Sequence, residues 1–191
     1  MNLEDLRETI GREEVRSISR RYFISNGFDG TLTSVGITVG SFLSGVPDGL
    51  TVFKVGIGAA VGLATSGLWS VWEIERAEKL AELRELEKAM QKDLKQTRLY
   101  QQKEDARVVN ALMSGTGPVI GIVLPILPFL LEGAFISMLQ ATIMSVAIAV
   151  SLLFSFGAYM GGISKQKWYI AGLRMGLAGL VVTLINILLP G

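Results

Sequence analysis

Cysteine and histidine are both absent from the 191 residues of the chain. Their absence excludes disulfides, thiolate and imidazole zinc sites, and catalysis by Cys or His. A metal ion must therefore be bound by oxygen ligands or methionine sulfur, and oxygen ligands suit Mg²⁺, Ca²⁺, Mn²⁺ and, with less preference, Fe²⁺. No nucleophile–base pair and no cofactor fingerprint is recognisable, so we predict neither an enzyme nor a permanently bound cofactor.

An excess of charge of one sign is also lacking. The 18 basic and 17 acidic residues leave a net charge of +1, which gives no indication of nucleic-acid binding. Half of the residues are hydrophobic, the mean hydropathy is +0.46, and the charges are gathered in a few segments. This composition predicts an integral membrane protein. The N-terminal segment is charged throughout, so no cleavable signal peptide is predicted.

Five apolar runs, each near the ~20 residues that a bilayer requires, predict an all-α membrane protein with five transmembrane helices. The runs are Tyr22–Gly45, Thr51–Ile74, Val108–Leu131, Ala134–Ala158 and Trp168–Leu189. They divide the chain into an N-terminal amphipathic helix (1–21), spans one and two (22–74), a helical arm (75–107) and the last three spans (108–191). We expect the second span to continue into the arm as one helix, because no helix-breaking residue interrupts it.

The distribution of lysine and arginine predicts the orientation. Five precede the first run, nine lie between Arg76 and Arg107, and two lie between the fourth and fifth runs. The positive-inside rule therefore places the N-terminus and the arm in the cytoplasm and the C-terminus on the opposite side. We predict a multi-pass protein of the bilayer, in the plasma membrane if the source is prokaryotic.

The first run contains one acid, Asp29. At ~1.5 Å per residue it lies ~12 Å beyond the Arg20–Arg21 pair, well inside a hydrocarbon core of ~30 Å. A lone acid there costs about 2.5–3.5 kcal/mol, so such residues normally face a polar interior and mark an ion or proton path. Gly27 and Gly30 flank Asp29, and two interpretations stay open. They loosen the helix and free carbonyls for an ion, or they only pack.

The arm carries two patterns at helical spacing. One is acidic and the other apolar, and they consist respectively of Glu75, Glu78, Glu82 and Glu85, and of Leu83, Leu86, Met90 and Leu94. The carboxylates, with Met90 as the arm's only sulfur ligand, are candidates to collect a divalent metal ion. The alternative is a solvated or partner-packing face, because lysines and arginines are interleaved with the acids.

Three short motifs resemble the vacuolar iron transporter family. They are Phe28-Asp29-Gly30 in the first run, the Pro125–Leu131 segment Pro-Ile-Leu-Pro-Phe-Leu-Leu, and Gly172-Leu173-Arg174-Met175 at the start of the last run. The resemblance implies a homodimer that exports Fe²⁺ or Mn²⁺ from the cytosol in exchange for protons, along a path between the subunits. It assigns Asp29 to that path, with Asn26, Gly27 and Gly30 around it. It also makes Glu73 and Glu75 an acidic entrance on the cytoplasmic side.

A carboxylate in a low-dielectric interior suits such an exchange. The surroundings disfavour its ionised form, while an arriving cation favours that form and displaces the proton. Two rivals remain open. One is a passive cation channel with the same fold. The other is a non-transporting membrane scaffold whose cytoplasmic helix binds a partner.

Overall fold

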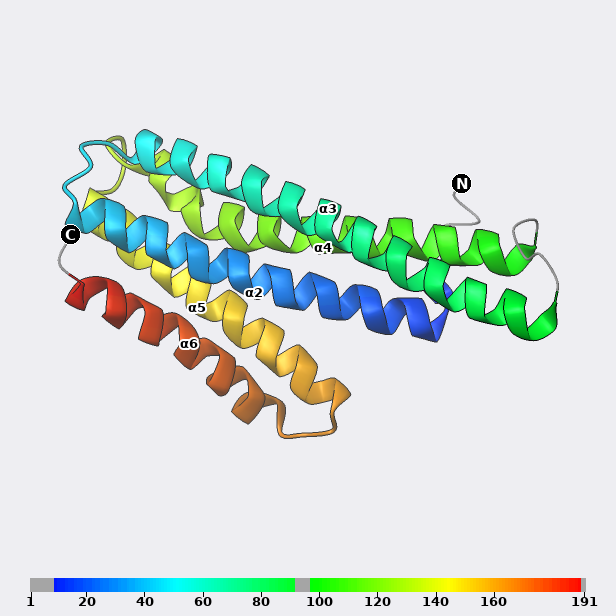
Figure 1. The fold of residues 1–191 in the computed structure, drawn as a ribbon. Helices are drawn as coiled ribbons and strands as arrows, with labels where there is room; N and C mark the ends of the chain where they lie inside the picture. Colours follow the sequence, from blue (N-terminus) through cyan, green and yellow to red (C-terminus); the bar gives the residue numbers. More distant parts are fainter. Residues whose placement is uncertain (1–8, 92–96, 190–191) are drawn as a thin grey trace.

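The computed structural model describes residues 9–91 and 97–189, which form a bundle of long helices (Figure 1). Its elements are α2 (Glu13–Leu43), α3 (Gly49–Met90), α4 (Arg98–Ile126), the 3₁₀ helix η1 (Leu127–Leu131), α5 (Met138–Ile163) and α6 (Trp168–Leu188). No strand forms within these two ranges, so the predicted all-α class is confirmed there.

Four helices are long and apolar enough to cross a membrane. They are Gly49–Met90, Tyr100–Leu131, Met138–Ile163 and Trp168–Leu188, which overlap the second to fifth apolar runs. Many large hydrophobic side chains on them are exposed, as expected where helices face lipid. The chain is therefore a multi-pass membrane protein. The helix α2 is not among the four, because Asn26, Asp29 and several hydroxyl side chains interrupt its apolar residues.

The helix α2 begins well before the first predicted span. A short helical segment at residues 9–11 ends at Arg12, whose backbone is extended (φ −72°, ψ 127°), and α2 starts at Glu13. Glu13 and Glu14 favour this start, because acids in a first turn interact well with the helix dipole. No helix end falls at residue 21, the predicted boundary between an N-terminal helix and the first span, because α2 passes Tyr22 without a break. Residues 1–8 of the predicted amphipathic helix lie outside the described residues.

The helix α3 continues from the bundle into the arm, as expected, but ends at Met90. It starts at Asp48, whose carboxylate accepts a hydrogen bond from the Thr51 N–H at 2.7 Å. It ends where Gln91 adopts the left-handed conformation (φ 50°), and α4 then runs back beside it. The arm is thus a helical hairpin, and Leu94 lies outside the described residues.

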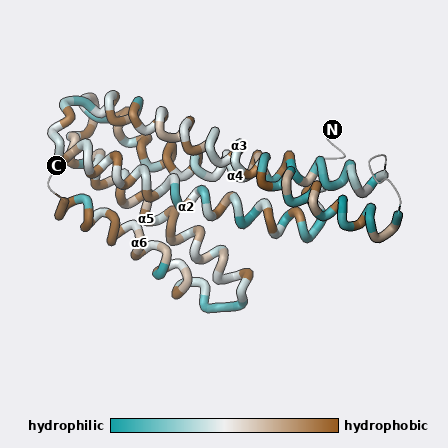
Figure 2. Tube along the Cα trace, in the orientation of Figure 1, coloured by the Kyte–Doolittle hydropathy of each residue, from teal (hydrophilic) through white to brown (hydrophobic). Residues whose placement is uncertain are grey.

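The core joins α3, α4, η1 and α5 around buried side chains that include Val52, Ile122, Ile126 and Phe129. The helix α2 packs along α4, and the α5–α6 hairpin packs against α2. At one end α2, α3 and α4 extend beyond α5 and α6 (Figure 1), and this protruding part is much more hydrophilic than the rest (Figure 2). We call it the arm end of the bundle.

Candidate functional site

Asp29 lies on an exposed face of α2. Its carboxylate has no hydrogen bond or ion pair with any described residue, and only its backbone oxygen accepts a bond, from Thr33 Oγ1 at 2.8 Å. Helical periodicity places Asn26, Thr33, Gly36 and Gly40 on the same side of α2. A Cβ atom at Gly36 or Gly40 would meet nothing within 4 Å. We call these five residues the α2 stripe. It is a narrow, open strip of small residues that bears one unpaired acid.

Asn26 is held in place by two other helices. Its Nδ2 donates to Ser114 Oγ at 2.5 Å, and Ser114 Oγ donates in turn to the Gly67 carbonyl at 2.8 Å. These bonds join α2 to α4 and α3 one turn from Asp29. The Asn26 side-chain oxygen accepts no hydrogen bond from the described residues.

Gly27 and Gly30 do not loosen α2, because α2 is helical from Glu13 to Leu43. Both glycines are buried against α4 and α5, away from the α2 stripe. A Cβ on Gly30 would lie 2.7 Å from Pro118 Cα, and one on Gly27 would lie 3.1 Å from the Phe156 ring. The helix-loosening interpretation is therefore wrong. These glycines allow close approach of the helices, and the intact α2 hydrogen bonds leave no carbonyl free for an ion.

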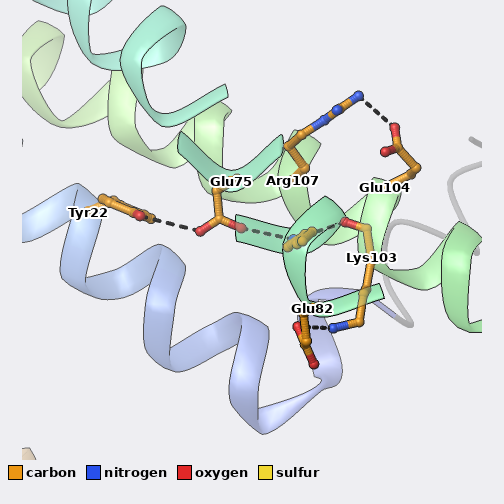
Figure 3. Close-up of polar contacts among 7 residues, drawn as sticks. Tyr22, Glu75, Glu82, Lys103, Glu104 and Arg107 are labelled. Atoms are coloured by element: carbon orange, nitrogen blue, oxygen red, sulfur yellow. Dashed lines mark hydrogen bonds and ion pairs between the residues drawn. The ribbon is translucent and has the colours of Figure 1, made fainter. Parts of the chain in front are cut away.

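Glu75 lies at the base of the arm and is only 4% exposed. Its carboxylate pairs with Lys79 Nζ at 2.9 Å and accepts a hydrogen bond from the Tyr22 hydroxyl at 3.3 Å (Figure 3). Lys79 also donates to the Lys103 carbonyl at 2.9 Å. These bonds connect α2, α3 and α4, so Glu75 ties the three helices together, and each of its carboxylate oxygens already has a partner. Glu73, by contrast, is exposed and loosely paired with Arg76 at 3.8 Å.

The other predicted arm ligands are dispersed. Glu82 pairs with Lys103, Glu78 and Glu85 are exposed, and Met90 is 59% exposed. Over residues 9–91 and 97–189 no three acidic side chains are grouped closely enough to hold a metal ion. A metal-collecting role for the arm stays a prediction.

The apolar stripe of the arm is used, in part, within the chain itself. Leu83 is 5% exposed, and Leu86 lines a pocket between the α3–α4 hairpin and α2. Leu83 is thus buried within the chain and not available to a partner-binding seam, while Met90 of the same stripe remains exposed. This observation weakens the scaffold alternative.

Sequence reasoning missed Ser114, Gly67 and Tyr22 as supports of the site. Each forms a contact between residues far apart in the chain, such as the Asn26–Ser114 bond and the Tyr22–Glu75 bond. One signal was present: Ser114 lies in a run of small residues, which indicates a close helix contact, but not which helix it meets.

Comparison with known proteins decides the family. The VIT family profile matches residues 69–189, which is more than half of the chain. The chain belongs to the VIT family. It is also similar to an uncharacterised protein of the archaeon Methanocaldococcus jannaschii, with 27% identity over 168 residues that cover 86% of this chain and 85% of that protein. The resemblance to the vacuolar iron transporter family is thereby confirmed.

Membership of the VIT family indicates metal-ion transport across a membrane, not catalysis. The matched residues begin at the middle of α3 and extend through α6, so they do not include α2 and Asp29.

Proposed function

We propose that this VIT family protein carries divalent metal ions, Fe²⁺ or Mn²⁺, out of the cytosol in exchange for protons, and that the Asp29 carboxylate is the group for which ion and proton compete. The observation that carries the proposal is the exposed, unpaired carboxylate of Asp29 on the α2 stripe. A structural acid in a helix bundle would be expected to have a partner within the bundle. Asp29 has none among the described residues of its own chain.

In this proposal α2 crosses the membrane as a fifth span. It is 31 residues long, and at ~1.5 Å per residue it exceeds a hydrocarbon core of ~30 Å. It also packs along α4, which is one of the four apolar helices. The charged arm end lies in the cytoplasm by the positive-inside rule, and the C-terminus lies on the opposite side. Asp29 is then within the bilayer and needs a polar counterpart there.

A second copy of the chain supplies that counterpart. Gly36 and Gly40 leave the α2 stripe without side chains that would keep another helix away, as in close helix dimers within membranes. A two-fold axis along the stripe places each residue opposite itself. Asp29 and Asp29 of the partner subunit then face one path, with an Asn26 oxygen beside each. Carboxylate and amide oxygens are ligands that suit Mn²⁺ and, less strongly, Fe²⁺.

Exchange follows from electrostatics in that position. Two carboxylates close together in a low-dielectric path cannot both stay ionised without a cation, so a proton neutralises the pair when the path is empty. A divalent cation replaces the proton, and the proton returns when the cation leaves. Glu73, exposed at the base of the arm, is the better placed of the two predicted entrance acids, because Glu75 is already paired.

Ion flux into liposomes tests this function. The chain, reconstituted into liposomes, should take up Mn²⁺, or Fe²⁺ under anaerobic conditions, faster when the lumen is acidic, since outgoing protons then drive incoming ions. A gradient of one pH unit supplies up to about tenfold accumulation per exchanged proton. A protonophore should remove the acceleration. Uptake that ignores the gradient would identify a passive channel, and absence of uptake by the folded protein would contradict transport.

Cross-linking tests the dimer separately. Because the chain has no native cysteine, Gly36→Cys or Gly40→Cys introduces one thiol per subunit. We expect oxidation in membranes to produce a covalent dimer, since residues near a two-fold axis come within the ~7 Å between Cα atoms that a disulfide allows. Leu184→Cys on the exposed face of α6 is the matched control and should stay monomeric on denaturing gels. Equal cross-linking of the three variants would argue against an α2-centred dimer.

A further inference from the structure

A groove opens between α2, α4 and α5 next to the arm end of the bundle. Its volume is about 460 Å³, within the range of sites that bind small molecules. Figure 1 shows why it forms: α5 draws away from α2 toward this end, and the α5–α6 hairpin stops before α2 does. The floor is apolar and includes Phe23, Ile24, Met113 and Phe156. Phe23 and Phe156 meet edge to face, with ring centroids 5.9 Å apart.

The charged side chains that line the groove are all positive. Arg16 and Arg20, one turn apart on α2, line it, and none of the described residues that line it is acidic. Neither guanidinium forms an ion pair with a described residue. The groove therefore combines two unpaired positive charges with an apolar floor, a pattern that fits a ligand with an anionic head and a hydrocarbon tail.

The order of these residues along the helices gives the groove a direction. Arg16 and Arg20 precede Phe23 and Ile24 on α2, so the charges lie toward the arm and the aromatic floor lies deeper in the bundle. Tyr159, near the end of α5, lines the groove and is 51% exposed. Tyrosine is enriched at the level of lipid headgroups. The headgroup of a bilayer lipid would thus lie at the arginines, and its acyl chain would lie along the aromatic floor.

We propose that this groove binds an anionic phospholipid of the leaflet at the arm end, with its phosphate on Arg16 and Arg20 and an acyl chain along Phe23 and Phe156. The site is separate from the α2 stripe and does not depend on which ion the protein carries. Each basic residue at a membrane surface contributes about a fivefold preference for anionic lipid. Two arginines should therefore favour an anionic headgroup by about 10- to 30-fold.

Native mass spectrometry of the full-length protein tests the proposal. The protein is released from detergent after incubation with palmitoyl-oleoyl phosphatidylglycerol or with phosphatidylcholine of the same acyl chains. We expect about 10- to 30-fold greater retention of phosphatidylglycerol, and Arg16→Gln with Arg20→Gln should reduce it to the phosphatidylcholine level. Arg21→Gln is the matched control, because Arg21 is adjacent in sequence but stacks on Tyr22 outside the groove.

A second variant tests the apolar part. Ser155 is exposed and lines the groove, so Ser155→Trp should fill it and reduce retention of both lipids while leaving the arginines in place. Equal retention of the two lipids by the native chain, or equal losses with Arg21→Gln, would overturn the proposal. So would displacement of the lipid by excess inorganic phosphate, which would show a headgroup site without an acyl groove. A change in oligomer mass on substitution, without change in lipid, would show that a second copy occupies the groove.

Discussion

Replacing Asp29 with asparagine should reduce metal-ion flux through the reconstituted protein by about 10- to 100-fold. Interactions with a charged group contribute about 1.5–3 kcal/mol, and each 1.4 kcal/mol corresponds to a factor of ten. The substitution keeps the size and the polarity of the side chain but removes the negative charge that attracts the cation. Because Asp29 makes no side-chain bond within the described residues, this loss should not be accompanied by unfolding.

Two further variants separate the charge from its position. Asp29→Glu keeps a carboxylate one methylene further from the backbone and should retain part of the flux. Glu13→Gln is the matched control, since it neutralises an exposed acid on the same helix at the arm end and should leave the flux unchanged. Parental flux in Asp29→Asn, with the protein shown to be folded, would refute the proposed role.

The response to pH is the second part of this result. In the native chain, acidifying the side from which the ion enters should slow its entry, because protons compete for the Asp29 carboxylate. Asparagine does not exchange a proton in this range, so any residual flux of Asp29→Asn should be independent of the pH gradient. A residual flux that still follows the gradient would place the proton-exchanging group elsewhere.

The all-α fold and four of the spans could be predicted because hydrophobic length and charge segregation are properties of contiguous residues. The end of α3 could not be predicted, because Gln91 ends the helix in a left-handed conformation although it is neither glycine nor proline. The start of α2 was missed for a related reason. Arg12 breaks the preceding helical turn without a recognisable breaker, and the charged and apolar parts of α2 form one helix.

The candidate site divides in the same way. Asp29 could be singled out because an acid inside an apolar run is unusual in any fold. The contacts around the site could not be predicted, because the Asn26–Ser114 bond and the burial of Glu75 depend on which faces of α2, α3 and α4 meet. The glycines show the same limit. Gly36 and Gly40 have a spacing typical of helix packing but face open space within the chain, whereas Gly27 and Gly30 carry the contact with α4 and α5.

The close contact of Gly30 with α4 predicts a large effect of substitution. Gly30→Ala should destabilise the folded protein by about 1–3 kcal/mol, the usual cost of inserting a methyl group into a close-packed contact. The new Cβ would lie 2.7 Å from Pro118 Cα and 2.9 Å from the Pro118 carbonyl oxygen, so backbone, not a flexible side chain, would have to move. Gly121→Ala should have a similar effect, because its Cβ would lie 2.5 Å from the Gly27 carbonyl oxygen. Thermal unfolding in detergent measures both.

The double variant tests whether the two glycines belong to one contact between α2 and α4. Once the first methyl group has moved the helices apart, the second finds part of the space already made, so the combined loss should be smaller than the sum of the single losses. Gly58→Ala is the control, because a Cβ there meets nothing within 4 Å and alanine is the better helix former. Additive losses, or a loss at Gly58 equal to that at Gly30, would mean that backbone propensity and not the α2–α4 approach sets the requirement for glycine.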